Sequence, residues 1–263
     1  MTRNHSLIRG MGLLRALAAR PSGATVPELA EVTDLPRSTI ARLLATLHEL
    51  GAVERQDSRV WILGPEVARI GRVADPFQAL RERGYETVRR LSQEFHESAM
   101  IAVVYENWET ETILQADAPN LVGATSWLGK RHGGVLHAAA TGKLALARLS
   151  DDELRRHVTP LRAFTSATIT SVDALAEELE RVRAQGWATT IDELELGLTA
   201  VAVTIEDAVV AAGAGARSLS LSLSGLSARL DVDRIPAIVE QLTAAAQRLA
   251  RGARTSSGDA PHE

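Results

Sequence analysis

The chain has 263 residues, of which 45% are hydrophobic and 24% are charged, a composition typical of folded domains. This length is long for one compact domain, so we expect two. The absence of cysteine excludes disulfides and thiolate metal sites and suits the reducing cytoplasm, where we expect the protein to act.

The charge is unevenly distributed along the chain. Residues 1–73 hold ten arginines and seven acids, a net charge of +3, whereas the remaining 190 residues hold 19 bases and 26 acids, a net charge of −7. A mildly basic front end on an acidic body is typical of a nucleic-acid module joined to a second domain.

The N-terminal stretch superficially resembles a signal peptide. However, Arg9 and Arg15 interrupt its apolar run, and no stretch of the chain approaches the length of a membrane span, so we expect no membrane partner. The spacing instead predicts a helix with Ser6 as its N-cap. Its predicted inward stripe consists of Leu7, Met11, Leu14 and Ala18.

A helix-turn-helix is predicted next. Thr25 and Glu28 have the spacing of a capping box, which starts a short helix from about Val26 to Val32. Thr33–Leu35 then makes a tight turn into a second helix. The stretch Leu35–Gly51 holds that second helix, because its apolar residues recur at i, i+3, i+4 and i+7. They are Ile40, Leu43, Leu44 and Leu47, with Pro36 suited to the first turn and Gly51 to the left-handed stop.

The opposite face of this second helix carries short hydrogen-bonding and cationic side chains, which suit phosphates and guanine edges. The candidate DNA-contacting residues on it are Arg37, Ser38, Thr39, Arg42 and Thr46. Two strand-like runs, Ala52–Arg55 and Arg59–Leu63, predict a hairpin wing with Arg55 and Arg59 beside its tip. A small helical subdomain with a solvated basic face is the alternative. The order of cap, turn, helix, glycine and hairpin favours double-stranded DNA as the partner.

The domain boundary is predicted at Arg72–Asp75. A short helix from Gly64–Pro65 precedes it, and Pro76 begins a long helix. We therefore expect a DNA-binding domain over residues 1–73, a second domain over 75–250 and a disordered tail over 251–263.

The second domain alternates predicted strands and helices. The predicted elements are a hairpin of Ala99–Tyr105 with Glu111–Gln115, a long loop Asp117–Gly134, a helix His137–Leu149, a capping box at Ser150, a helix capped within Thr170–Asp173, and strands Leu198–Ile205 and Ser218–Ser224. In the last strand, serines alternate with leucines, so the leucine face belongs to the core. The serine face is either solvated or lines a polar pocket.

Several segments together resemble the isocitrate-lyase-regulator (IclR) family of bacterial transcription factors. The matching segments are LIRGMGLLRALAA, TVPELAEVTDLPRSTIARLLATLHELGAVER, VLHAAATGKLALA, TITSVDALAEELERVRAQGWATTIDELELGLTAVAV and SLSLSG. The resemblance implies an α+β fold, with an N-terminal winged helix-turn-helix joined by a linker helix to a GAF-like α/β effector-binding domain. It also implies a DNA-binding regulator, commonly a repressor, that acts as a homodimer or homotetramer on palindromic operators and responds to a small-molecule effector.

The resemblance also implies an effector pocket. The positions carried over are Trp127, Leu128, His137, Ala140, Thr141, Thr190, Asp192, Leu198, Ala200, Ser222 and Ser224. Thr190 stands where relatives often carry an acid, and Ala200 stands where they often carry cysteine. A small organic acid is the expected effector, with glyoxylate-like or pyruvate-like ligands as one possibility, and a neutral polar metabolite is the alternative. The stretch Glu206–Arg217 departs from the family pattern and is expected to be a flexible loop.

Two alternatives to this kind of regulator are open. One is an enzyme with a DNA-binding front end that uses His137, Thr141 or Asp192, but no triad-like spacing supports it. The other is a regulator of a different winged-helix family, against which the HAAATGK and ELELGLTAVAV segments argue. A histidine pair, His132 and His137, lacks a clear third ligand, so no metal and no cofactor is expected.

Overall fold

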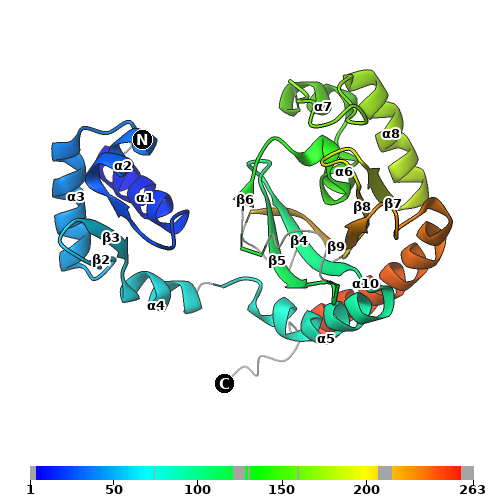
Figure 1. Cartoon of the computed structure of the whole chain (residues 1–263), viewed down its shortest axis with the longest axis horizontal. Helices are drawn as coiled ribbons and strands as arrows, with labels where there is room; N and C mark the ends of the chain where they lie inside the picture. Colours follow the sequence, from blue (N-terminus) through cyan, green and yellow to red (C-terminus); the bar gives the residue numbers. More distant parts are fainter. Residues whose placement is uncertain are drawn as a thin grey trace. The chain divides into compact units, whose positions relative to one another are not determined.

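The computed structural model describes residues 4–73, 75–120, 128–129, 131–158, 160–206 and 215–255, with 252–255 as backbone only. The chain divides into two compact units, Met1–Asp75 and Pro76–Glu263, which are described separately (Figure 1).

The first unit combines four helices with a small three-stranded sheet in its described part. Its elements are α1 (His5–Ala18), β1 (Ala24–Thr25), α2 (Val26–Thr33), α3 (Arg37–Glu49), β2 (Val53–Arg55), β3 (Val60–Leu63) and α4 (Pro65–Val73). The strands are antiparallel in the order β1–β3–β2. A two-residue strand such as β1 leaves no periodic signal, so the sequence did not indicate it.

Helix α1 faces the core with a different row of side chains from the predicted one. The buried residues are Gly10, Leu13 and Leu17, whereas Leu7 and Met11 are exposed. The N-cap is Asn4, whose side-chain oxygen accepts hydrogen bonds from the first backbone N–H groups, and not Ser6. The helix carries two neighbouring apolar rows, and periodicity alone does not choose between them.

The helix-turn-helix follows the predicted order. The Thr25–Glu28 capping box is present, with the Thr25 N–H donating to the Glu28 carboxylate at 2.7 Å. Helix α2 ends at Thr33 and is capped by Asp34, which adopts a left-handed conformation with φ of 51°. Pro36 is the N-cap of α3 and not part of its first turn. Gly51 follows α3 with φ of 69°, the stop that favours glycine.

The second unit is built on a six-stranded antiparallel sheet with the order β6–β5–β4–β9–β8–β7. Its strands are β4 (Ser98–Tyr105), β5 (Thr110–Ala116), β6 (Arg131–His132), β7 (Trp187–Ile191), β8 (Leu198–Thr204) and β9 (Ala216–Leu226). Its helices are α5 (Gln78–Phe95), η1 (Leu136–Ala138), α6 (Ala140–Leu146), α7 (Asp151–His157), α8 (Val172–Gln185), η2 (Val232–Arg234) and α10 (Ile235–Thr255).

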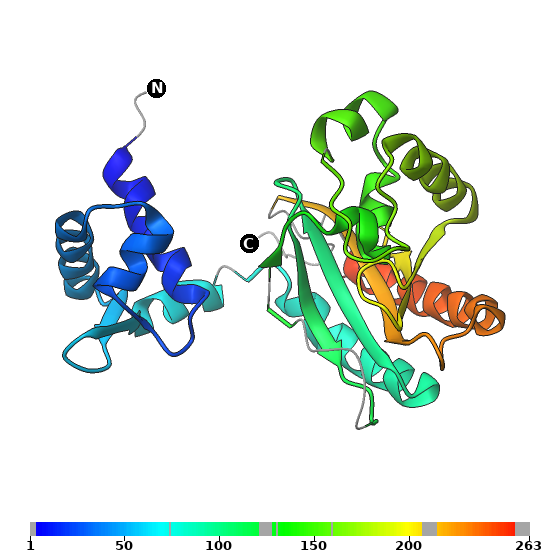
Figure 2. The same cartoon turned by 45° about the horizontal axis from the view of Figure 1, so that its top comes forward.

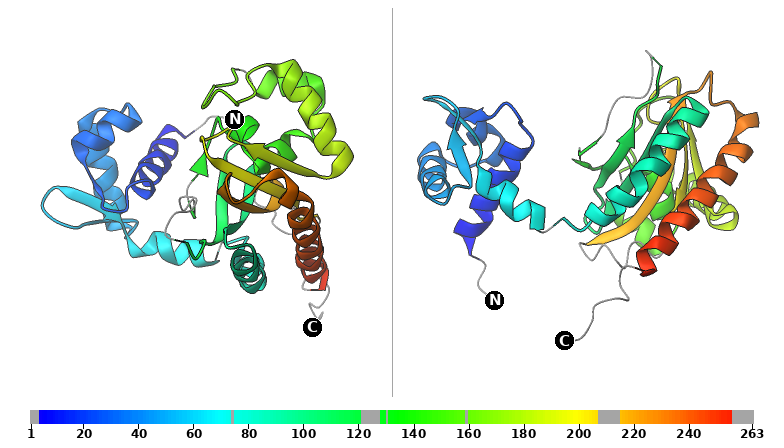
Figure 3. Two further views of the ribbon diagram at one scale, coloured as in Figure 1. Left: turned by 45° about the vertical axis from the view of Figure 1, so that its right-hand side comes forward. Right: turned by 90° about the horizontal axis from the view of Figure 1, so that it is seen from below.

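Helices cover both faces of this sheet. Helices α5 and α10 pack side by side on one face, as the right-hand view of Figure 3 shows. Helices α6, α7 and α8 lie on the other face and form a separate apolar cluster with it (Figure 2). The central strands β4 and β9 are therefore buried from both sides.

Strand β9 shows this double burial most clearly. Leu219, Leu221 and Leu223 are fully buried against α5 and α10, as predicted. The serines of the other face, Ser218 to Ser224, are also buried, at 1–7% exposure. A solvated serine face is thus wrong, because α6 and η1 cover that side of the sheet.

Several predicted boundaries need correction. The helix predicted over His137–Leu149 is the short 3₁₀ turn η1 followed by α6, and α5 begins at Gln78 and not at Pro76. Helix α10 continues to Thr255, so residues 251–255 are helical and not a disordered tail. Residues 256–263 and most of Glu206–Arg217 lie outside the described residues.

Candidate functional site

The first candidate site is the outer face of α3. Ile40 and Leu44 are fully buried, and they fix the helix on the unit's core. Of the five predicted contact residues on α3, four are exposed and Thr39 is half-buried. The exposed residues are Arg37, Ser38, Arg42 and Thr46. The buried stripe therefore orients one continuous polar face to solvent, where a major groove can be reached.

The hairpin of β2 and β3 forms the wing next to α3 (Figure 2). Its turn is fixed by Asp57, whose carboxylate accepts hydrogen bonds from the backbone N–H groups of Arg59 and Val60 at 2.7 and 2.8 Å. Both hydrogen bonds lower the pKa of Asp57, and the one from the Arg59 N–H has the larger effect. Arg55 and Arg59 are exposed on either side of this turn, and the Arg55 guanidinium lies 4.8 Å from the Trp61 ring centre.

The second candidate site is a cavity of about 130 Å³ between the serine face of the sheet and α6. Seven predicted effector residues line it: Ala140, Thr141, Thr190, Leu198, Ala200, Ser222 and Ser224. Nine lining residues were not predicted: Met100, Ala102, Thr110, Thr112, His132, Val135, Ala138, Ala139 and Leu194. Met100 and Ala102 pair across the sheet with Ser222 and Ser220, so strand alternation plus sheet order would have identified them.

Gly142 brings the walls of this cavity together. A Cβ atom at Gly142 would lie 2.2 Å from the Leu136 carbonyl oxygen, so only glycine lets α6 pack this closely on η1. The close approach places Ala138 of η1 and Thr141 of α6 in one wall.

The lining is mostly apolar, with a row of hydroxyl groups. Among the described lining residues none is Asp, Glu, Lys or Arg, and His132 is the one ionisable side chain. The Ser222 hydroxyl is buried and has no hydrogen-bond partner among the described residues. Buried hydroxyls are nearly always hydrogen-bonded, so this one is available to a water molecule or a ligand atom in the cavity.

Three predicted effector residues in the described part of the chain do not line the cavity. The His137 side chain is buried on the other side of η1, where Nε2 lies 2.9 Å from the Arg162 carbonyl oxygen. The Asp192 carboxylate turns toward the backbone N–H of Gly197 and the hydroxyl of Ser227. Leu128 is half-exposed beside β5, and Trp127 lies outside the described residues.

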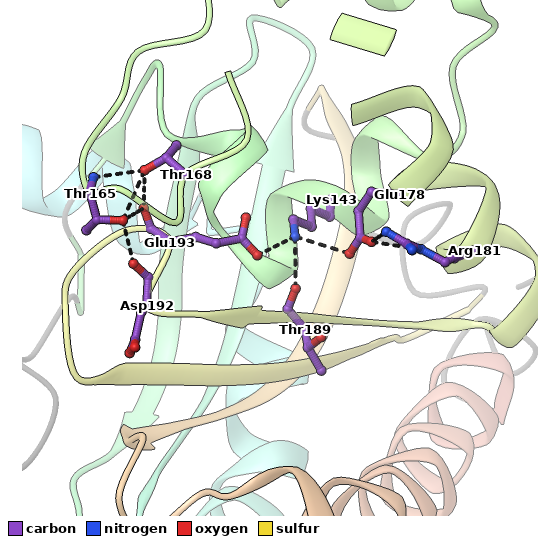
Figure 4. Close-up of polar contacts among 8 residues, drawn as sticks. All are labelled: Lys143, Thr165, Thr168, Glu178, Arg181, Thr189, Asp192 and Glu193. Carbon is purple, nitrogen blue, oxygen red and sulfur yellow. Dashed lines mark hydrogen bonds and ion pairs between the residues drawn. The ribbon is translucent and has the colours of Figure 1, made fainter. Parts of the chain in front are cut away.

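A buried ion pair joins α6 to the loop after β7 (Figure 4). The Lys143 ammonium, 1% exposed, donates to the Glu193 carboxylate at 2.6 Å, to Glu178 at 3.2 Å and to the Thr189 carbonyl at 3.1 Å. Burial raises the pKa of Glu193, which the hydrogen bond from Lys143 opposes. Its second carboxylate oxygen is buried with no hydrogen-bond partner among the described residues.

The described residues include no group of three or more potential metal-ligating side chains. None of the helices in the described part of the chain is long and apolar enough to cross a membrane.

A winged helix-turn-helix with an exposed polar recognition helix, joined in one chain to a domain with a buried cavity, defines the class of ligand-binding transcriptional regulators. Family models for the IclR helix-turn-helix domain and for the bacterial transcriptional regulator IclR C-terminal match residues 6–57 and 78–251. The chain belongs to the IclR family.

Individual relatives are consistent with this assignment. The chain is 32% identical over 207 residues to the Pca regulon regulatory protein of Pseudomonas putida. The aligned region covers 77% of this chain and 69% of that protein. It is 30% identical over 207 residues to the transcriptional repressor IclR of Escherichia coli K12, with coverage of 77% and 74%. An IclR homolog from Microbacterium hydrocarbonoxydans, solved with 4-hydroxybenzoate, superposes with a TM-score of 0.79 at 21% identity, covering 95% of this chain and 99% of that one.

These matches confirm the predicted family, fold class and class of function. The protein is a DNA-binding transcriptional regulator, and the alternatives of an enzyme and of another winged-helix family are wrong.

Proposed function

We propose that the protein is a repressor that two copies of α3 hold on a pseudo-palindromic operator, and that a small organic acid in the cavity controls its affinity for DNA. The observation that carries the effector half of this proposal is the buried Ser222 hydroxyl, which faces the cavity without a partner among the described residues.

The cavity favours an acid of about the size of one ring. Cavities of about 150 Å³ accept a benzene-sized molecule, and this one is about 130 Å³. Hydroxyls of Thr141, Thr190, Ser222 and Ser224 offer donors to a carboxylate. The nearby acids do not oppose it, because Asp192 is turned toward Gly197 and Glu193 is bound by Lys143. The relative solved with 4-hydroxybenzoate supports the same chemical class.

The DNA half of the proposal assigns base contacts to α3 and phosphate contacts to the wing. Side chains at the N-terminal part of a recognition helix reach base edges in the major groove, whereas wing arginines meet the backbone. A dimer is required for two half-sites, and α1 leaves Leu7, Ile8 and Met11 exposed as an apolar surface that a second copy would cover. The repressor names of several relatives support repression over activation.

A thermal-shift screen of monocarboxylic acids tests the effector half. An acid that binds the folded protein at 100 times its dissociation constant should add about 2.7 kcal/mol to the free energy of unfolding. Footprinting of the protein on the DNA upstream of its own gene then tests the DNA half. Two protected half-sites about one helical turn apart are expected, and the stabilising acid should abolish the protection. Protection that no stabilising acid alters would contradict the proposal.

A further inference from the structure

The loop between β7 and β8, Asp192–Gly197, closes one side of the cavity. Leu194 is the loop residue that lines the cavity within the described part of the chain, and its side chain is half-buried. Leu196, two residues along, is 69% exposed and does not line it. The loop therefore presents one leucine to the ligand space and one to solvent.

The base of this loop is held by its own first residue. Asp192 adopts a left-handed conformation with φ of 59°. Its carboxylate accepts hydrogen bonds from the Gly197 N–H at 2.9 Å and from the Ser227 hydroxyl at 2.6 Å. Its own N–H donates to the Leu198 carbonyl at 2.9 Å, so the loop is closed at both ends.

A second set of contacts holds the residues just before Leu194 (Figure 4). The Thr165 hydroxyl donates to the Asp192 carbonyl and the Thr168 hydroxyl donates to the Glu193 carbonyl, each at 2.6 Å. The Glu193 side chain is held by Lys143 at 2.6 Å. These groups come from α6 and from the segment before α8, so the loop is tied to two other parts of the unit.

Most surface loops have few such contacts and adjust to what binds beside them. The backbone carbonyls of Asp192 and Glu193 and the side chain of Glu193 are held by buried or half-buried groups, which restricts how far Leu194 can move away from the cavity. We infer that Leu194 is a specificity-determining residue that limits the size of the effector, and that Thr165, Thr168 and Lys143 are positioning residues that hold it in place. This inference rests on the proposed effector cavity and adds its size limit.

The test measures size selection in the full-length protein by titration calorimetry. Two pairs of probes are used, benzoate with 4-isopropylbenzoate and the neutral benzene with isopropylbenzene, because the neutral pair reports on cavity size without a carboxylate. Leu194→Ala removes three carbons, about what the isopropyl group adds. The variant should shift the affinity ratio toward the larger probe by about tenfold or more in each pair that binds.

Leu196→Ala is the matched control, since it removes the same atoms from the same loop but from its solvent side. It should leave both ratios unchanged. Leu194→Phe is the opposite variant and should weaken the larger probe most. A Leu194→Ala ratio equal to that of the wild-type protein overturns the inference while the effector cavity stands.

The neutral pair separates this inference from the proposed function. If the hydrocarbons show the size shift while no acid binds, the effector is not an acid but Leu194 still limits its size. If no probe of either pair binds the wild-type protein or Leu194→Ala, the size limit and the proposed effector site are both wrong.

The positioning role is tested by Thr168→Val, which keeps the shape of the side chain and removes the hydroxyl. It should move the affinity ratio in the same direction as Leu194→Ala, and Thr168→Ser, which restores the hydroxyl, should return it to the wild-type value. A wild-type ratio in Thr168→Val would remove Thr168 from the positioning residues.

Discussion

The polar side chains of the two candidate sites differ in exposure: those of the first unit face solvent and those of the second are buried. In the first unit the polar residues of α3, such as Arg42, are exposed over a core in which Ile40 and Leu44 are fully buried. In the second unit the polar groups at and beside the cavity are buried, among them Lys143, Glu193 and Ser222. DNA is a large partner that comes to the surface, whereas a small effector must be enclosed. Substitutions on the polar face of α3 should therefore change DNA binding and leave stability unchanged. In the second unit the buried ion pair should contribute to stability and the cavity hydroxyls to effector binding.

The largest effect is expected at the buried ion pair. Lys143→Met should lower the free energy of unfolding of the second unit by about 3–5 kcal/mol, because it leaves Glu193 buried without its cation. Urea unfolding measures this loss. Adding Glu193→Gln should recover part of it, since the unpaired charge is then removed.

The control for that prediction is Arg155→Ala, which breaks the exposed ion pair with Asp173 and should cost at most about 1 kcal/mol. Equal losses of unfolding free energy in Lys143→Met and Arg155→Ala would show that burial does not determine how much an ion pair contributes to the stability of the second unit.

Ser222→Ala should separate ligand binding from stability within one strand. It should weaken the effector found in the screen by about 1–3 kcal/mol and leave the ligand-free protein at least as stable, because a buried hydroxyl without a described partner is removed. Ser218→Ala is the matched control. Its hydroxyl is equally buried and also has no hydrogen-bond partner among the described residues, but it does not line the cavity. Calorimetry should find equal effector affinity in Ser218→Ala and the wild-type protein.

Arg42→Ala should weaken binding of the operator by about 1–3 kcal/mol and relax the choice of DNA sequence, because a base contact is lost. Its free energy of unfolding should match that of the wild-type protein, since Arg42 is exposed. Competition binding with operator and unrelated DNA measures the specificity. A variant that discriminates between them as well as the wild-type protein does would place the base contacts elsewhere.

The smallest effect is expected in the wing. Arg59→Gln should weaken operator and unrelated DNA alike and reduce the slope of log affinity against log salt by about 1, the signature of one lost phosphate contact. Binding measured across a salt series reports that slope. An unchanged slope would mean that Arg59 meets no phosphate.

More of the first unit than of the second could be predicted from the sequence, for physical reasons. A capping box, a helical stripe, Gly51 and two strand-like runs are local signals, and they located α2, α3 and the wing. The effector cavity depends on pairings between distant strands, so Met100 and Leu194 were missed although Ser222 and Thr141 were found through the family pattern. Asp192 was carried over to the cavity from the family pattern. Its left-handed backbone turns the carboxylate toward Gly197, which no pattern in the sequence indicates.

Helix α1 shows the same limit inside the first unit. Both of its apolar rows have helical spacing, and only the packed structure shows that Leu13 and Leu17 face the core while Leu7 and Met11 do not.

The central claim is that one chain reads DNA on its surface and an effector in its interior. It is tested most directly by measuring the effector concentration that releases half of the operator DNA from the wild-type protein, Ser222→Ala and Arg42→Ala. Ser222→Ala should hold the operator normally but need about 5–150 times more effector, the equivalent of 1–3 kcal/mol. Arg42→Ala should hold the operator weakly while binding the effector with unchanged affinity. Release of Ser222→Ala at the wild-type effector concentration would contradict the account.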